Sequence, residues 1–301
     1  ARSLNTLTLG EDYPVFWDAW DIESDSLEKQ VRLTGMGESG RVEDEHQYRI
    51  SYEATVGVGS VLRQTMIIHK KLRRIDFETE VDWKERHTLL RSEFPTTLQS
   101  DHALYDVPFG YIRRSTHTNT TLERAMFEVP AHKFAALQDP CLLVALATDS
   151  KYGYGAHQGE LSVSLLRSPA APDPASDLGV HHFTYSLLLA DDLLGVYEQA
   201  CELNNPPLPV KEPFEPLVRV AQKQFAVETV KVSEDGQELV IRVREWLGVG
   251  GVAALSFSPR LDEQTLMLTN MLEEPIDQEK KLRFRPFEVQ TYRIKVRTLG
   301  Q

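Results

Sequence analysis

The chain has 301 residues, 41% of them hydrophobic and 26% charged, which is the composition of an ordinary globular protein with one large or two smaller domains. Its formal net charge of −12 argues against a nucleic-acid partner, because binding to phosphates requires a basic surface. No stretch approaches the roughly 20 apolar residues that cross a bilayer, so no membrane partner is expected. The two cysteines, Cys141 and Cys201, are far apart and are expected to be reduced, buried thiols in a cytoplasmic protein, with a single disulfide as the alternative.

The first notable segment, residues 13–21, is rich in aromatic and acidic side chains. Such a segment suits sugar binding, because exposed tryptophan rings stack on the C–H faces of sugars and carboxylates accept hydrogen bonds from hydroxyl groups. The alternative is that the tryptophans are core or interface anchors, which the residue type alone favours because tryptophan is mostly buried. The residues concerned are Trp17, Asp18, Trp20 and Asp21.

The next segments alternate apolar and polar residues with the period of two that is typical of strands. Residues 49–56 are followed by a glycine-rich turn and a second such run at 61–68, which predicts a hairpin. In residues 74–83 five side chains share one face and should point into a core: Ile75, Phe77, Thr79, Val81 and Trp83.

Strand patterns recur further along the chain, whereas helical patterns are rare. Residues 160–166 and 182–187 read as strands, and only short stretches such as 191–202 could be helical. Strands that return this often with few helices between them predict an all-β fold of antiparallel sheets packed face to face.

Two segments between the strands have unusual composition. Residues 106–120 mix aromatic, basic and hydroxyl side chains on an expected loop, which could bind a polar ligand or satisfy its own polar groups. Residues 149–155 interleave glycine with tyrosine, which predicts a turn whose backbone lies close to another part of the protein. An expected hairpin then leads to Arg167 and a proline-rich loop.

A proline-dense stretch at residues 204–216 divides the chain, because it can sustain neither a helix nor a sheet ladder. Beyond it, Asp235-Gly236 lies between two alternating runs and predicts a hairpin. We therefore expect a large sandwich at residues 1–203, a linker at 204–216 and a small sandwich at 217–301.

The sequence lacks recognisable metal and catalytic motifs. Its nine histidines are scattered, and the adjacent pair His181 and His182 would point to opposite faces of a strand. No nucleophile elbow, phosphate loop or dinucleotide fingerprint is found. Metal ligands are therefore not expected in this chain. A pair of catalytic carboxylates would come together only in the fold, and most of the 45 acidic residues are expected to lie on the solvated surface.

Blocks spread over nearly the whole chain resemble, in the same order, glycoside hydrolase family 38, in particular its cytosolic and bacterial α-mannosidase branch. One of them is the Trp-Asp-Ala-Trp-Asp segment at residues 17–21. The others are residues 11–14, 74–87, 109–112, 116–120, 127–133, 150–154, 165–169, 172–174, 183–185, 203–206 and 285–288.

The resemblance implies a galactose-mutarotase-like supersandwich followed by a smaller C-terminal β-sandwich. Members of the family are retaining, zinc-dependent exo-α-mannosidases whose zinc ligands and catalytic aspartates lie in an N-terminal domain, so zinc is expected there and not in this chain. The expected partners are that catalytic domain, an α-mannoside bound through the full-length enzyme, and a second copy in a homo-oligomer. The family has further strands before the Trp-Asp-Ala-Trp-Asp segment, so the first sandwich is expected to lack them, either as an expressed fragment or as a naturally split chain.

The resemblance also implies that these β domains close one side of the active-site pocket and supply an arginine and a tyrosine. The hairpin that contains Tyr154 and Arg167 looks like the place of that arginine, and residues 17–21 are a candidate rim. Arg167 would orient or neutralise a carboxylate by bidentate hydrogen bonding, or would instead brace the proline loop that follows it.

We therefore expect the non-catalytic C-terminal part of an α-mannosidase, which closes the pocket and supports assembly. The alternative from the binding class is a free-standing carbohydrate-binding module that uses exposed tryptophans. A third hypothesis, that the supersandwich itself catalyses as in sugar epimerases of this fold, finds no ordered match in the sequence.

Overall fold

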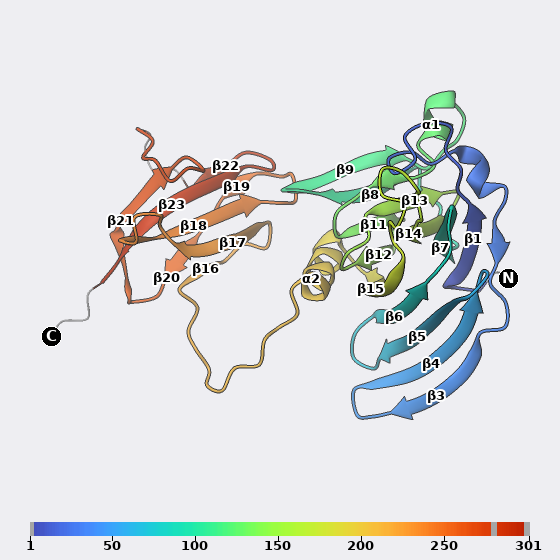
Figure 1. Ribbon diagram of the computed structural model, residues 1–301. Coiled ribbons are helices and arrows are strands. Elements are labelled where there is room, and N and C mark those ends of the chain that lie inside the picture. Colours follow the sequence, from blue (N-terminus) through green and yellow to red (C-terminus); the bar gives the residue numbers. More distant parts are fainter. Residues whose placement is uncertain (1–2, 278–281, 298–301) are drawn as a thin grey trace. The chain divides into compact units, whose positions relative to one another are not determined.

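The computed structural model describes residues 3–277 and 282–297. The chain forms two compact units, the first from residues 1–106 and 112–206 and the second from residues 107–111 and 207–301 (Figure 1). The second unit thus includes a short segment from the first half of the chain, which the contiguous domains expected from the sequence did not include. Residues 205–217, which connect the units in sequence, contain neither helix nor strand.

The first unit is built from two antiparallel sheets whose apolar faces share one core (Figure 1). The six-stranded sheet has the order β10-β13-β14-β7-β1-β2. The nine-stranded sheet has the order β3-β4-β5-β6-β15-β12-β11-β8-β9. The predicted all-β fold of antiparallel sheets is confirmed.

The strands of the six-stranded sheet are β1 (Thr6–Glu11), β2 (Val31–Arg32), β7 (Thr88–Pro95), β10 (Val129–Pro130), β13 (Gly153–His157) and β14 (Glu160–Leu166). Those of the nine-stranded sheet are β3 (Gly37–Glu43), β4 (Gln47–Val56), β5 (Ser60–His69), β6 (Arg74–Trp83), β8 (His102–Val107), β9 (Gly110–Ser115), β11 (Phe134–Gln138), β12 (Leu143–Thr148) and β15 (Gly179–Ala190). The hairpin predicted around residues 57–60 is confirmed, because β4 and β5 pair from Val56 and Ser60 outward.

Strand β6 shows why these sequences form a sandwich. The face predicted to point inward does so, and its Phe77 ring stacks on Tyr185 of β15 at 5.1 Å between ring centres. The same ring meets Phe94 of β7, in the other sheet, edge to face at 5.6 Å. Aromatic contacts of this kind add to the burial of apolar surface that holds the two sheets together.

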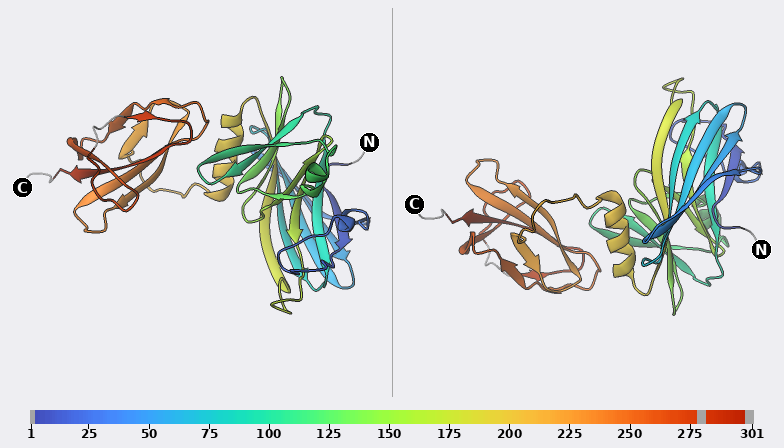
Figure 2. Two further views of the ribbon diagram at one scale, coloured as in Figure 1. Left: turned by 90° about the horizontal axis from the view of Figure 1, so that it is seen from above. Right: turned by 90° about the horizontal axis from the view of Figure 1, so that it is seen from below.

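The helices of the first unit are short. They are the 3-10 helix η1 (Ser24–Leu27), α1 (Thr121–Ala125), which begins with a capping box between Thr120 and Glu123, and α2 (Leu193–Asn204). Helix α2 packs against β12 and β15 (Figure 2). In the part of the chain that the structure describes, no helix has the length and apolar character needed to span a bilayer.

Both cysteines are free, but they are not both buried as the sequence analysis expected. Cys141 is exposed, because it lies in the tight turn between β11 and β12, where its N–H donates to a carboxylate oxygen of Asp139 at 2.8 Å. Cys201, on α2, is half-buried.

The second unit has its own core around a four-stranded sheet of order β17-β18-β23-β21. The predicted hairpin is confirmed, because β17 and β18 pair antiparallel around a turn in which Gly236 has a φ of 73°. Two small ladders, β16-β20 and β19-β22, complete the unit. The strands are β16 (Val218–Val220), β17 (Phe225–Val232), β18 (Glu238–Glu245), β19 (Gly251–Val252), β20 (Leu255–Phe257), β21 (Leu261–Thr269), β22 (Arg283–Phe284) and β23 (Val289–Val296).

Candidate functional site

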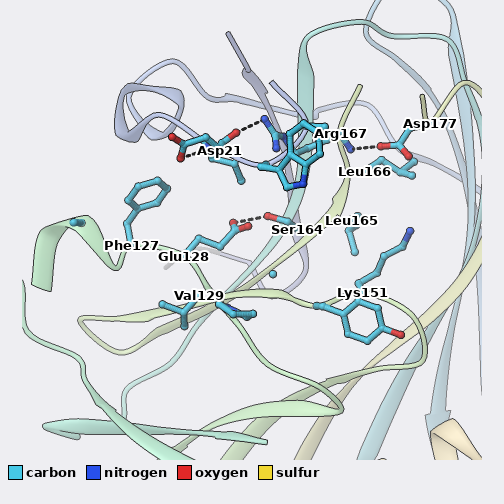
Figure 3. Close-up of a pocket in the computed structure, with 17 residues that line it drawn as sticks. Asp21, Phe127, Glu128, Val129, Lys151, Ser164, Leu165, Leu166, Arg167 and Asp177 are labelled. Atoms are coloured by element: carbon cyan, nitrogen blue, oxygen red, sulfur yellow. Dashed lines mark hydrogen bonds between the residues drawn. The ribbon is translucent and has the colours of Figure 1, made fainter. Parts of the chain in front are cut away.

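One pocket of the first unit brings together three of the six residues predicted to contact a ligand: Trp20, Asp21 and Arg167 (Figure 3). It has a volume of about 750 Å³. Its walls come from the loop between β1 and η1, from α1 and the segment after it, and from the ends of β13 and β14. The lining residues are 19–22, 125, 127–130, 151–153, 164–167 and Asp177.

The loop between β1 and η1 presents its tryptophans to the outside. Trp17 and Trp20 are 73% and 72% exposed, and their rings meet edge to face at 6.4 Å. The carbonyl of Trp17 accepts hydrogen bonds from the N–H groups of Trp20 at 2.7 Å and Asp21 at 2.9 Å. Trp17 also has a φ of 57°, which is rare for a bulky residue and requires that the surroundings hold the loop. The two tryptophans are therefore not core anchors of this chain, and the alternative that they are interface anchors stays a prediction.

Arg167 is the side chain that holds this loop. Its Nε and Nη2 donate to both carboxylate oxygens of Asp12, at 2.5 and 3.0 Å, in a bidentate ion pair. Nη2 also donates to the backbone carbonyls of Asp18, at 2.9 Å, and of Asp21. Arg167 therefore neutralises a carboxylate of its own chain, one that is only 1% exposed, and it braces the aromatic loop rather than the proline loop.

The proline loop is held by Asp18 instead. The Oδ2 atom of Asp18 accepts hydrogen bonds from the N–H groups of Ala170, at 2.7 Å, and Ala171, at 3.1 Å. Its Oδ1 lies 3.9 Å from Nδ1 of His87, and the ring of His87 stacks on Tyr13 at 4.4 Å. The Asp18 side chain thus points into the protein, and neither it nor Trp17 lines the pocket.

The prediction that Tyr154 contacts a ligand is wrong. Tyr154 occupies an inward-facing position of β13, is fully buried, and its hydroxyl group lies 2.9 Å from Oγ1 of Thr148. Burial raises the pKa of the Tyr154 hydroxyl far above its ordinary value. The pocket is lined instead by Tyr152, which precedes the strand and is 53% exposed.

The pocket also contains a carboxylate that the sequence analysis did not select. Glu128 accepts a hydrogen bond from the hydroxyl of Ser164 at 2.5 Å, and its Oε2 lies 3.7 Å from Nε of buried Arg91. A Cβ on Gly153 would lie 2.4 Å from Oε1 of Glu128. The close backbone approach predicted for residues 149–155 is confirmed, although the glycine lies in strand β13 and not in a turn.

We expect Gly153→Ala to destabilise the protein by about 1–3 kcal/mol, because the added methyl group overlaps the Glu128 carboxylate and forces it to move. Urea unfolding followed by circular dichroism measures the change. The matched control is Gly40→Ala on edge strand β3, where a Cβ meets no atom within 4 Å, and its effect should stay within about 0.5 kcal/mol. Equal effects of the two substitutions would contradict the packing seen at Gly153.

Lys151 is the second charged residue of the pocket that the sequence analysis did not single out as a ligand contact. Its Nζ lies 4.5 Å from the centre of the Phe183 ring. Burial lowers the pKa of the Lys151 ammonium group, and the carboxylates of Asp177 and Asp149 oppose this effect only in part. The sequence signal for Lys151 was the glycine-tyrosine pattern of residues 149–155 that contains it, which marked a close approach but not its chemistry, whereas Glu128 lies outside that pattern.

Two sequence models of known protein families match this chain. The sequence model of the "Glycosyl hydrolases family 38 C-terminal domain" matches residues 2–175, and that of the "Glycosyl hydrolases family 38 C-terminal beta sandwich domain" matches residues 224–292. The chain belongs to glycosyl hydrolase family 38. It corresponds to the C-terminal region of that family, as the sequence blocks predicted.

Similar proteins in this family are much longer than the chain. "Alpha-mannosidase G" of Dictyostelium discoideum and "Alpha-mannosidase 2C1" of Homo sapiens are each 34% identical to it, over 96% and 95% of the chain. The chain spans 29% of each of them. The crystal structure of an alpha-mannosidase from Enterococcus faecalis V583 has the same fold, with a TM-score of 0.76 over 97% of this chain and 38% of that one, at 18% identity.

The described residues of this family 38 chain do not fit a zinc site. Among them, no group of three or more His, Cys, Asp or Glu side chains could hold a metal ion. We therefore assign no metal ligand among these residues and derive no step through zinc.

The other candidate segment of this family 38 chain, residues 106–120, is not the single loop that the sequence analysis expected. Part of it is β9, and Thr120 caps α1. Arg113 and His117 line a second, polar hollow of about 610 Å³ together with Asp101 and His102. This hollow is separate from the pocket that contains Arg167.

Proposed function

We propose that the chain is the non-catalytic, β-rich C-terminal part of an α-mannosidase that hydrolyses terminal α-D-mannosides. The observation that carries the proposal is the family match together with relatives named alpha-mannosidase, of whose length the chain spans 29%. The catalytic groups would then lie in the remaining part of such an enzyme, which is the chain's main partner.

The side chains described above have a structural task in this proposal. Arg167 and Asp18 fix the loop of residues 13–21, so that Trp17 and Trp20 are held outside the core in one arrangement. An aromatic surface of this kind can pack on a sugar or on the neighbouring catalytic domain. The pocket beside it, with Trp20, Asp21 and Arg167 in its wall, would form one side of the space that receives the mannoside.

Finer features belong to the same proposal. The enzyme would retain anomeric configuration and use a zinc ion bound in its catalytic domain, as the resemblance to family 38 implies. We propose a cytoplasmic location, in keeping with two free cysteines. Assembly into a homo-oligomer is a further proposal.

Hydrolysis by the native protein tests this function. An antibody raised against the chain should isolate from the source organism a protein that cleaves an aryl α-D-mannoside, whereas the 301-residue chain alone should not. Mass spectrometry of the isolated protein shows whether the chain is covalently joined to a catalytic domain or bound to a separate one. Hydrolysis by the chain alone, or no α-mannosidase activity in the native protein, would overturn the proposal.

A second candidate is a free-standing carbohydrate-binding module, which is favoured by the exposure of Trp17 and Trp20. The same immunopurification separates the two functions. A module would be isolated at the mass of the chain, without a catalytic partner and without hydrolytic activity.

A further inference from the structure

Two charged side chains line the pocket with one polar atom each left without a hydrogen-bonding partner. In Glu128, Oε2 accepts from Ser164, but Oε1 accepts no hydrogen bond from any residue that the structure describes. In Lys151, the ammonium group forms no hydrogen bond or ion pair within the described part of the chain, and its Nζ lies 4.5 Å from the centre of the Phe183 ring. Figure 3 shows both side chains in the wall of the same pocket.

Both side chains are half-buried, and a polar atom without a hydrogen-bonding partner has a cost there, although the Glu128 carboxylate is ion-paired through Oε2 with Arg91 at 3.7 Å. A charged group removed from water loses hydration, and a partner with complementary polar atoms restores the lost interactions. Burial already lowers the pKa of Lys151, which records this loss of hydration. The pair therefore favours a ligand that offers a donor to Glu128 and an acceptor to Lys151.

The Glu128 carboxylate is held in place from behind rather than free to turn away. Ser164 donates to it from β14, Arg91 of β7 lies 3.7 Å from it, and the absence of a side chain at Gly153 leaves the space that Oε1 occupies. Arg91 is itself only 4% exposed, and its Nη2 donates to the hydroxyl of Ser162 at 2.6 Å. Such a supported polar group is preorganised for binding, because little ordering remains to be done when a ligand arrives.

The other lining residues indicate a ligand with apolar faces and no net charge. Trp20, Phe127 and Tyr152 supply aromatic surface, and rings of this kind pack on the C–H faces of pyranoses. Of the remaining charged groups, the exposed Asp21 accepts a hydrogen bond through Oδ1 from the N–H of Ile22 at 3.0 Å, and the other two are engaged within the protein. Asp177 accepts from the backbone N–H of Arg167, whose guanidinium group is used by the aromatic loop. The volume of about 750 Å³ lies within the range of small-molecule sites.

We propose that this pocket binds a neutral monosaccharide unit, with Glu128 accepting and Lys151 donating hydrogen bonds to its hydroxyl groups and with Trp20 packing on its apolar face. The inference rests on the proposed function, which supplies mannose as the sugar. It adds the side chains that recognise the sugar, none of which was assigned that role from the sequence except Trp20. It also requires that the chain bind the sugar without hydrolysing it.

The test is a titration of the 301-residue chain with methyl α-D-mannopyranoside, followed by tryptophan fluorescence and by calorimetry. We expect saturable, weak binding, in the millimolar range that a few hydrogen bonds and one stacked ring support. Glu128→Gln and Lys151→Met should each weaken binding about tenfold or more, which corresponds to about 1.4 kcal/mol. Trp20→Ala should weaken binding and remove most of the fluorescence change.

The matched controls are Glu45→Gln and Lys71→Met, which change exposed residues outside the pocket and should leave binding unchanged. Circular dichroism and urea unfolding of each variant separate loss of binding from loss of fold. Glycine, added as a small zwitterion, tests the other ligand that one acid and one base could hold. Binding of glycine in place of the mannoside would overturn the proposal.

Two outcomes distinguish this inference from the proposed function. If the native protein hydrolyses α-mannosides but the chain shows no sugar binding up to about 0.1 M, the inference fails and the proposed function stands. If the chain binds the sugar through Glu128 and Lys151 but the native protein hydrolyses nothing, the proposed function fails and the binding site stands. Binding that the pocket variants do not weaken overturns the inference in either case.

Discussion

Replacing Arg167 by methionine should destabilise the first unit by about 3–5 kcal/mol, the cost of removing one partner from a buried ion pair. The substitution leaves the Asp12 carboxylate, only 1% exposed, without its bidentate partner, and it frees the carbonyls of Asp18 and Asp21. Urea unfolding measures the change in free energy. Limited proteolysis should in addition cleave the loop of residues 13–23 faster in the variant.

A double-mutant cycle tests whether the lost ion pair with Asp12 is the reason for the loss of stability in Arg167→Met. Asp12→Asn combined with Arg167→Met should be less destabilising than the sum of the two single substitutions by about 1 kcal/mol or more, because the double variant no longer buries an unpaired charge. The matched control is Arg73→Met, which removes an exposed ion pair to Asp191 and should cost at most about 1 kcal/mol. Additive effects of Asp12→Asn and Arg167→Met would show that the pair is not what holds the loop.

The contacts of Arg167 with Asp12 and with the loop of residues 13–21 could not be predicted from the sequence. The segments around Arg167 and residues 17–21 could both be selected, because their composition is unusual and matches family 38. Their connection could not be predicted, because Asp12 and Arg167 are 155 residues apart and meet only when β1 and the end of β14 lie in one folded unit. Composition was therefore enough to select the two segments. The contacts that each residue makes depend on tertiary packing and follow only from the structure.

The same limit explains the error at Tyr154 and the omission of Glu128. Tyr152 and Tyr154 are both plausible pocket residues by type, and the point at which β13 begins decides which of them is buried. Glu128 is one of 45 acidic residues, and only its position over Gly153 distinguishes it from the acids on the surface. Residue type alone shows neither which tyrosine is buried nor which carboxylate lines the pocket.

The fold was more predictable, because alternation of apolar residues is a local property. The inward face of β6 follows from the sequence alone, but its outward face holds an exception at Asp76, which is only 5% exposed. The exception comes from neighbours that are distant in sequence. Ser186 of β15 donates to Asp76 at 2.5 Å, and Arg74 beside it is within 4.0 Å of Glu202 on α2.

Replacing Asp76 by asparagine should therefore destabilise the protein at pH 7 by about 3 kcal/mol, at the lower end of the cost of breaking a buried ion pair. Arg74 donates to Asp76 through Nε at 2.6 Å and through Nη2 at 3.0 Å, and His69 lies 2.7 Å from its Oδ2. Burial alone would raise the pKa of the Asp76 carboxyl, but the hydrogen bonds from Arg74, Ser186 and His69 outweigh it and lower the pKa below the ordinary value of 3.8.

The lowered pKa makes the effect of Asp76→Asn depend on pH. Above pH 3.8 the carboxyl is ionised in both the folded and the unfolded chain, so its full contribution to stability is present. As the pH falls below that value, the unfolded chain takes up the proton first, and the contribution is lost as the pH passes through the folded-state pKa. The difference in unfolding free energy between the wild type and Asp76→Asn, measured in urea at a series of pH values, should accordingly be largest near neutrality and shrink at acidic pH. Glu78→Gln, on the same strand with an exposed ion pair to Arg49, should show a difference of at most about 1 kcal/mol throughout. A difference for Asp76→Asn that persists unchanged into acid would mean that the charge of Asp76 is not what stabilises the sheet.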